Sequence, residues 1–132
     1  MKFSTKSEYG LRALISLAKH QKEQPYSLAK IAKEQKISLA YLERLFAKLK
    51  KANLVKSEKG MKGGYSLVRS ANKISVKEIL NALEGSLRPY LCSDLNNLCK
   101  LNCDCSVKIV WHKLEEAMNR TLEEIKLSQL LK

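Results

Sequence analysis

The chain has 132 residues, of which 45% are hydrophobic, and a formal net charge of +12. This length fits one domain with at most an appended arm, and the apolar content excludes a wholly disordered chain. The low aromatic content argues against a stacking platform for single-stranded nucleic acid.

The positive charge is concentrated in one half of the chain. Residues 1–75 carry 17 Lys and Arg against 5 Asp and Glu, whereas residues 76–132 carry eight of each sign. A basic half joined to a neutral half indicates a module that binds a polyanion, joined to a part with another task. A solvated lysine-rich surface is the simpler alternative.

The first twenty residues do not form a signal peptide, because Glu8 and Arg12 interrupt the apolar run. No stretch approaches the ~18–20 apolar residues that a membrane span needs. We therefore predict a cytoplasmic protein without a membrane partner. In that compartment, four clustered cysteines are more typical of metal or redox ligands than of structural disulfides.

The first predicted helix runs from Thr5 to about His20, and Thr5 with Glu8 matches a capping box. A second helix is expected after Ser27 and a third after Ser38, each serine acting as the cap. The third helix has apolar residues at helical spacing, which predict a buried stripe of Leu39, Leu42, Leu45, Phe46 and Leu49. Two short helices of this kind predict a helix-turn-helix; an ordinary helical hairpin is the alternative.

A glycine-rich hairpin follows the third helix. Residues 54–57 and 65–68 are strand-like, and three glycines lie between them. Glycine permits the positive φ angles of a bent hairpin tip. This pattern predicts a wing that carries Lys59 and Lys62 towards phosphates or a minor groove. A nucleotide-binding loop is disfavoured because no G-K-[ST] is present.

The second half begins with another capping box, Ser75 with Glu78, which opens a short helix that Gly85 closes. Residues 86–104 show no periodicity. From about 105 to about 125 the sequence predicts a long helix with a broad apolar face, before a last turn at 127–131. A dimer interface explains this face best, and packing on the chain's own domain is the alternative. The apolar face comprises Val107, Val110, Trp111, Leu114, Ala117, Met118, Thr121, Leu122 and Ile125.

The expected fold is therefore mainly α with a small β-hairpin wing. Residues 1–85 would form a winged helix-turn-helix domain, 86–104 a cysteine-rich loop, and 105–132 a dimerisation helix and terminal turn.

The chain resembles the Rrf2 family of bacterial winged-helix regulators over nearly its whole length. The resemblance rests on Tyr9, on the run Ile37 to Glu43 (ISLAYLE), on Lys59-Gly60 with Gly63-Gly64-Tyr65, and on cysteines before a helix that contains Trp111. The family has iron–sulfur-binding members of the IscR-like and NsrR-like kinds, and CymR-like members that regulate cysteine metabolism.

By this resemblance, the cluster ligands would be Cys92, Cys99 and Cys105. Lys108 stands where IscR-like members have a histidine ligand. Glu8 matches the acidic residue that the partner subunit supplies in NsrR-like members, so it is a candidate fourth ligand. Cys103 is an additional thiol and a candidate alternative ligand.

Thiolates are soft ligands that hold iron–sulfur clusters, either [2Fe–2S] or [4Fe–4S]. Structural zinc on all four cysteines and thiol–disulfide switching remain alternatives. His20 is expected to cap helix carbonyls, and His112 to lie at a surface or interface.

The leading base contacts are predicted to be Ser38, Tyr41 and Arg44, of which Arg44 suits guanine. Glu43 would accept from cytosine or pair with nearby lysines. The remaining lysines of these helices would meet phosphates or remain bystanders. The complete predicted DNA-binding set is Ser38, Ala40, Tyr41, Glu43, Arg44, Lys48, Lys59, Lys62 and Gly63.

Together these features predict a homodimeric transcriptional regulator, such as a repressor, and not an enzyme. It would bind double-stranded DNA at a pseudo-palindromic operator and sense redox state, nitric oxide or iron–sulfur status. The alternatives are a cluster-independent, CymR-like regulator controlled by a metabolic enzyme or thiol oxidation, and a small redox or metal-trafficking protein without a DNA target.

Overall fold

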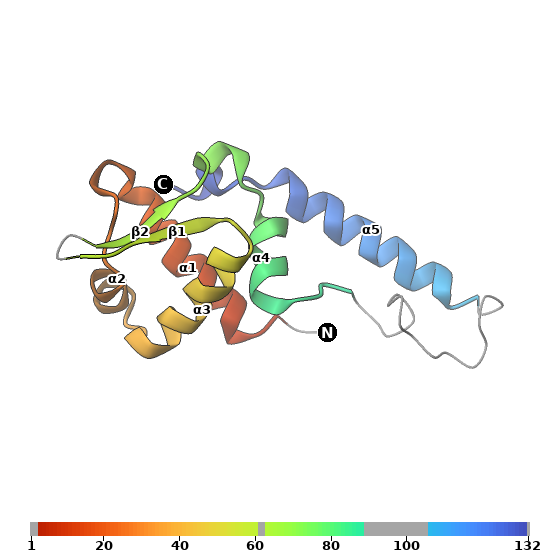
Figure 1. Cartoon of the computed structure of the whole chain (residues 1–132). Coiled ribbons are helices and arrows are strands. Elements are labelled where there is room, and N and C mark those ends of the chain that lie inside the picture. Colours follow the sequence, from red (N-terminus) through yellow and green to blue (C-terminus); the bar gives the residue numbers. More distant parts are fainter. Residues whose placement is uncertain (1–2, 61–62, 89–105, 132) are drawn as a thin grey trace.

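A computed structural model describes residues 3–60, 63–88 and 106–131 (Figure 1). Short 3-10 helices at Gln21–Glu23, Ala71–Lys73 and Leu127–Leu130 join or follow the main elements. The fold is mainly α with a two-stranded antiparallel wing, as the sequence predicts. The main elements are α1 (Thr5–Lys19), α2 (Leu28–Gln35), α3 (Leu39–Lys51), β1 (Val55–Glu58), β2 (Gly64–Leu67), α4 (Val76–Glu84) and α5 (Lys108–Glu124).

Serine side chains begin the helices. The predicted caps Ser27, Ser38 and Ser75 are confirmed, since each hydroxyl accepts a backbone N–H of its own first turn. The predicted cap of α1 is wrong by one residue: Ser4, not Thr5, accepts the N–H of Lys6 at 3.1 Å. The backbone N–H of Ser4 donates to Glu84, a distant residue that takes the place Glu8 would have in a capping box.

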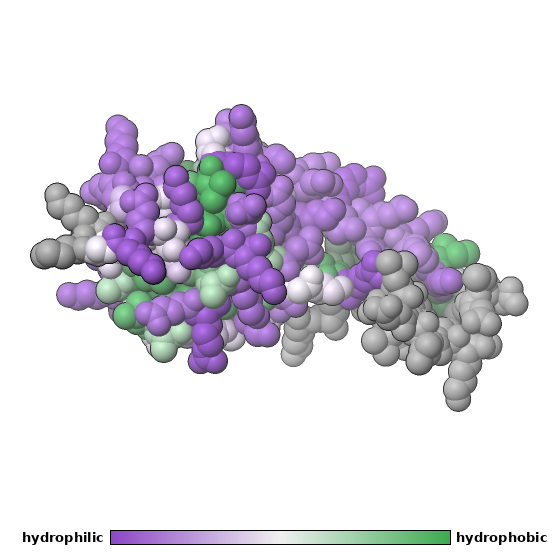
Figure 2. Space-filling view, viewed as in Figure 1, coloured by the Kyte–Doolittle hydropathy of each residue, from purple (hydrophilic) through white to green (hydrophobic). Residues whose placement is uncertain are grey.

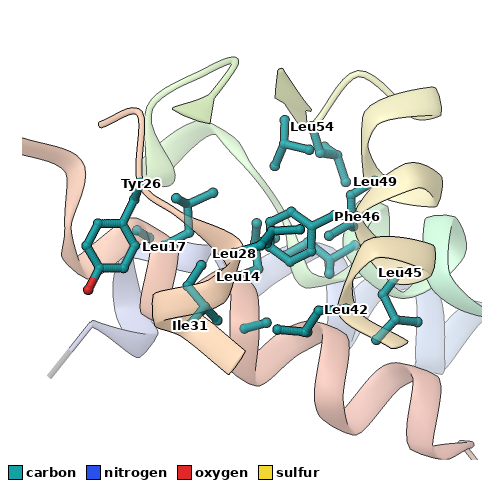
Figure 3. Close-up of a cluster of buried hydrophobic side chains, with 14 of the residues drawn as sticks. Leu14, Leu17, Tyr26, Leu28, Ile31, Leu42, Leu45, Phe46, Leu49 and Leu54 are labelled. Atoms are coloured by element: carbon teal, nitrogen blue, oxygen red, sulfur yellow. The ribbon is translucent and has the colours of Figure 1, made fainter. Parts of the chain in front are cut away.

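The core lies between α1, α2, α3 and α4; its largest fully buried side chains are leucines, isoleucines and one phenylalanine (Figure 3). Leu14 and Leu17 of α1 and Phe46 of α3 are fully buried, as their helical spacing predicts. Leu39 is an exception. It was expected in the buried stripe of α3, but its side chain is 41% exposed because it begins the helix beyond the edge of the core.

The wing is anchored to the body of the domain through strand β2. The strands pair from Val55 with Leu67 to Glu58 with Gly64. Tyr26, in the connection between α1 and α2, exchanges two backbone hydrogen bonds with Tyr65 of β2, at 2.9 and 2.8 Å. Gly64 lies so close to this connection that an added Cβ would be 2.3 Å from the carbonyl oxygen of Tyr26. The end of β2 that lies next to the hairpin turn is thus fixed to the connection that leads into α2.

The last helix leaves the compact part of the molecule. Helix α5 extends away from the other helices, and none of its described residues is buried (Figure 1). After α5 the chain returns: Leu127 is fully buried in the core, and its N–H donates to the carbonyl of Ile74 at 2.8 Å. This anchor fixes one end of α5 beside the start of α4. None of the described helices is long and apolar enough to cross a membrane.

Candidate nucleic-acid interface and cysteine segment

Helix α3 presents a mixed polar and apolar face to solvent. Ala40, Glu43 and Arg44 are exposed, at spacings that place them on one side of the helix. No hydrogen bond or ion pair joins Glu43 to another described residue, so the alternative intrahelical pair with lysine is not formed. These side chains are accessible to solvent, and their role as base contacts stays a prediction.

The predicted contacts Ser38 and Tyr41 are partly engaged within the fold. The hydroxyl of Ser38 accepts the N–H of Tyr41 at 3.1 Å. The half-buried ring of Tyr41 packs edge-on against Tyr9, and its hydroxyl shares a 3.2 Å hydrogen bond with Thr5. The Arg44 guanidinium lies 5.9 Å from the centre of the Tyr41 ring. Tyr41 therefore connects α3, the candidate recognition helix, to the first turn of α1.

The predicted wing and lysine contacts have different surroundings. Lys59 is exposed near the tip of the hairpin. Gly63 donates its N–H to Gly60 at 2.9 Å and closes the tip turn; Lys62 lies outside the described residues. Lys48 is exposed, and its ammonium group lies 3.5 Å from the carbonyl of Leu83 at the end of α4. As a DNA contact, each stays a prediction.

The helix-turn-helix and the wing carry a largely hydrophilic surface (Figure 2). Its exposed cations suit the evenly spaced phosphates of a duplex, which supply affinity rather than sequence choice. Exposed lysines lie on or just after α2, on α3, and on or just after β1; they are Lys30, Lys33, Lys36, Lys48, Lys50, Lys51, Lys56 and Lys59.

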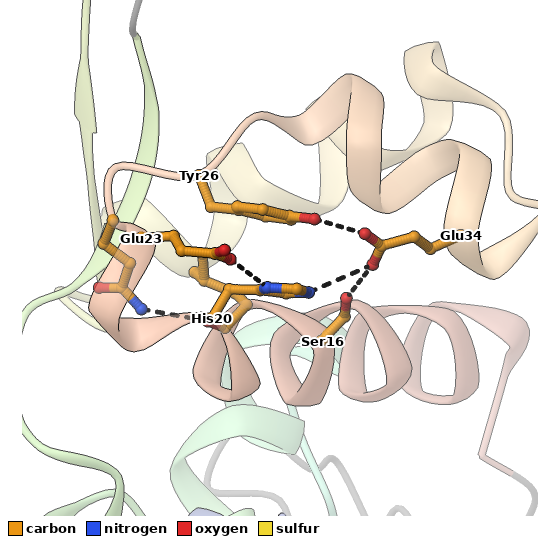
Figure 4. A network of polar contacts seen from close by, with 7 residues as sticks. Ser16, His20, Glu23, Tyr26 and Glu34 are labelled. Carbon is orange, nitrogen blue, oxygen red and sulfur yellow. Dashed lines mark hydrogen bonds and ion pairs between the residues drawn. The ribbon is translucent and has the colours of Figure 1, made fainter.

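Two sets of contacts that hold α2 against its neighbours are not predicted from the sequence. Arg12 of α1 donates to the backbone carbonyl of Gln35 at 2.6 Å and to its side chain at 3.3 Å, which holds the end of α2 at the turn. The sequence predicts that His20 caps helix carbonyls, but its ring makes other contacts. The ring stacks on Tyr26 at 4.0 Å, with one nitrogen 2.5 Å from Glu23 and the other 3.7 Å from Glu34 (Figure 4).

Glu34 is the centre of this polar cluster. It accepts hydrogen bonds from the hydroxyls of Tyr26 and Ser16. The hydrogen bond from Tyr26, with help from Ser16 and His20, lowers the pKa of Glu34 below its ordinary value despite burial. The same bond, together with burial and the charge of Glu34, raises the pKa of Tyr26 to about 12. The cluster joins α1 and α2, and the backbone of Tyr26 connects it to strand β2 of the wing.

Cys92, Cys99, Cys103 and Cys105 lie outside the described residues. Among the part of the chain that the structure describes, no three His, Cys, Asp or Glu side chains gather as a metal site. Glu8, the proposed fourth ligand, is exposed on the first turn of α1. Its carboxylate makes no hydrogen bond or ion pair with another described residue, and its role as a ligand stays a prediction.

Glu84, the last residue of α4, holds the start of α1. Its carboxylate accepts the N–H of Ser4 at 2.7 Å and the hydroxyls of Ser4 and Ser7 at 2.8 and 2.6 Å. Burial raises the pKa of Glu84, but the hydrogen bonds from Ser7 and Ser4 and the charge of Lys6 outweigh it and lower the pKa overall. The residues after Glu84 lead into the cysteine segment. The first turn of α1 therefore contacts α3 on one side and, on the other, the end of α4, which precedes the cysteine-rich loop in sequence.

A helix-turn-helix followed by a hairpin wing on a basic surface defines the class of winged helix-turn-helix DNA-binding proteins. The chain belongs to the Rrf2 family of transcriptional regulators: the family model, described as "Iron-dependent Transcriptional regulator", matches residues 3–132. It is thus a DNA-binding regulator and not an enzyme. Protein rrf2 of Nitratidesulfovibrio vulgaris is 38% identical over all of this chain and 88% of its own length. IscR of Xenorhabdus nematophila is 36% identical over all of this chain and 80% of its own.

Solved structures support the same fold in two kinds of relative. IscR of T. potens has a TM-score of 0.79 and 42% identity, covering 99% of this chain and 86% of that one. CymR of B. subtilis, the global cysteine regulator, has a TM-score of 0.80 and 34% identity, covering 99% and 96%. Because the chain is similar to both IscR and CymR, the comparisons establish its class as a DNA-binding regulator. They do not assign the signal that it senses.

Proposed function

We propose that the chain is a homodimeric regulator that binds a pseudo-palindromic promoter site and whose affinity depends on an iron–sulfur cluster held by cysteines. As a regulator of bacterial promoter DNA it would act in the cytoplasm. The proposal rests above all on the first turn of α1. This turn carries the unengaged Glu8, contacts the recognition helix through Thr5, and is held by Glu84 at the entrance to the cysteine segment.

The cluster would be held by Cys92, Cys99 and Cys105, with Glu8 of the other subunit as fourth ligand. Three thiolates and one carboxylate form a ligand set in which one bond is weak. When bound, such a cluster supplies a centre that responds to oxidants, nitric oxide or iron supply. The chain's own part is to transmit a shift of the first turn of α1: Thr5 and Tyr9 contact Tyr41, so this shift alters the position of α3.

The dimer would form along α5. The exposed apolar residues of α5 include Ile109 at 59%, Val110 at 56% and Leu114 at 37%, and Val107, which precedes the helix, is 53% exposed. Figure 2 shows apolar surface at the end of α5 that is remote from the winged helix. A second copy covering this face would give the dimer two recognition helices, one for each half-site of a pseudo-palindrome.

The proposal is tested by analysing iron, zinc and acid-labile sulfide in protein purified without oxygen. Iron and sulfide in comparable amounts are expected, and Cys92→Ser, Cys99→Ser and Cys105→Ser should each lower both. Zinc without sulfide would contradict the cluster and favour structural zinc on four thiolates.

A second function is supported by the likeness to CymR of B. subtilis, whose chain is matched over 96% of its length. In that case the cysteines would not be needed for binding, and a metabolic enzyme or thiol oxidation would supply the signal. Operator affinity that is unchanged after replacing all four cysteines with serine would favour this function over the cluster.

A further inference from the structure

Leu39 is an exposed apolar residue at the start of the recognition helix. Its side chain is 41% exposed, and it does not pack against the core, whereas Leu42, Leu45 and Leu49 of the same helix are at most 2% exposed. A leucine here adds nothing to the helix cap, which Ser38 supplies. The fold alone therefore does not explain why this position is apolar.

The position of Leu39 on α3 distinguishes it from scattered surface leucines, which are ordinary. It precedes Glu43 by four residues, as Ala40 precedes Arg44, so these residues share the outward face of the helix. Lys36, in the turn before α3, is also exposed and precedes Leu39 by three residues. Figure 2 shows apolar surface where α2 gives way to α3, within a hydrophilic surrounding.

In helix-turn-helix proteins, the first residues of the recognition helix face the base edges in the major groove. The major-groove edge of thymine carries a methyl group, which apolar side chains recognise by contact. We propose that Leu39, together with Ala40, recognises a thymine methyl in the operator. This inference rests on the proposed binding of DNA through α3. It assigns a specificity-determining role to a side chain that the sequence places in the core.

The test removes only the methyl group. The full-length chain, purified without oxygen, selects a duplex from a randomised library, and each thymine of that duplex is replaced singly by deoxyuridine. Dissociation constants are measured by fluorescence anisotropy at one salt concentration. For the unaltered chain, one thymine per half-site should cost about threefold to fivefold in affinity when demethylated, the equivalent of one buried methyl group.

Leu39→Ala should abolish this difference, so that the thymine and uracil duplexes bind equally. Val68→Ala is the matched control, because Val68 is a similarly exposed apolar residue, at 44%, outside α3; it should retain the difference. A preserved thymine preference in Leu39→Ala would overturn the proposal, as would a lower melting temperature, which would show a structural role. Failure to select any duplex would overturn DNA binding itself, and this recognition with it.

Discussion

Replacing Glu84 with alanine should destabilise the chain strongly, although Glu84 is a polar residue at a helix end. The change removes the acceptor of three hydrogen bonds, from Ser4 N–H and from the Ser4 and Ser7 hydroxyls, of 2.6 to 2.8 Å. It also leaves the Ser7 side chain, 4% exposed, without this partner. Hydrogen bonds to a charged group contribute ~1.5–3 kcal/mol each, and such bonds are not additive. We expect a loss of about 2–4 kcal/mol in the free energy of unfolding.

The assay is thermal and urea denaturation followed by circular dichroism at neutral pH. For a chain of this size the expected loss corresponds to a melting temperature lower by about 10 °C. Glu78→Ala is the matched control on the same helix, because its ion pair with Arg69 is 39% and 42% exposed. An exposed pair contributes at most ~1 kcal/mol. Equal stability of Glu84→Ala and Glu78→Ala would contradict the view that the hydrogen bonds of Glu84 with Ser4 and Ser7 hold the start of α1.

The same variant should reveal a pH dependence. The folded-state pKa of Glu84 lies below its ordinary value of 4.5. Its ionised form therefore stabilises the fold fully above pH 4.5, and this stabilisation is lost as the pH falls through the folded-state pKa. The stability difference between the unaltered chain and Glu84→Ala should accordingly shrink on acidification below pH 4.5.

Three further outcomes are expected. Gly64→Ala would bring a Cβ within 2.3 Å of the carbonyl oxygen of Tyr26; we expect a loss of about 1–3 kcal/mol in unfolding free energy and weaker DNA binding, and unchanged denaturation would contradict this. Tyr26 should ionise near pH 12, with stability present below pH 10 and lost as the pH rises through about 12; ultraviolet titration should show a late step that Tyr26→Phe removes. Val110→Glu on α5 should convert dimers to monomers in analytical ultracentrifugation while the helical circular dichroism is kept, whereas Lys113→Glu on the same helix should leave the dimer intact.

Local features of the fold could be predicted from the sequence because they are encoded by neighbouring residues. Ser27, Ser38 and Ser75 cap the helices that follow them, and glycines mark the hairpin. The spacing of apolar residues predicts burial correctly in the middle of α3 but fails at Leu39. At this end of the helix, no described element of the core extends far enough to cover the side chain. The sequence of a helix carries no information about where the elements packed against it end.

Contacts between distant residues could not be predicted in this way. Glu84 meets Ser4 across 80 positions, and Arg12 reaches the backbone of Gln35, for which no side-chain pattern exists. The mistaken capping box of Thr5 and Glu8 has the same cause: the sequence supplied a plausible local carboxylate, and the fold supplied a distant one. The predicted ligands Cys92, Cys99 and Cys105 lie outside the described residues and stay predictions.

The most direct test of the central claim is the operator affinity of the chain with and without its cysteine-bound cluster. The chain purified without oxygen and its Cys92→Ser, Cys99→Ser, Cys105→Ser triple variant would be titrated against the same selected duplex at the same salt concentration. We predict dissociation constants that differ about 5–150-fold, the range of a coupling of ~1–3 kcal/mol. Equal dissociation constants for the two proteins would contradict control by a cluster and leave a DNA-binding dimer whose signal acts elsewhere.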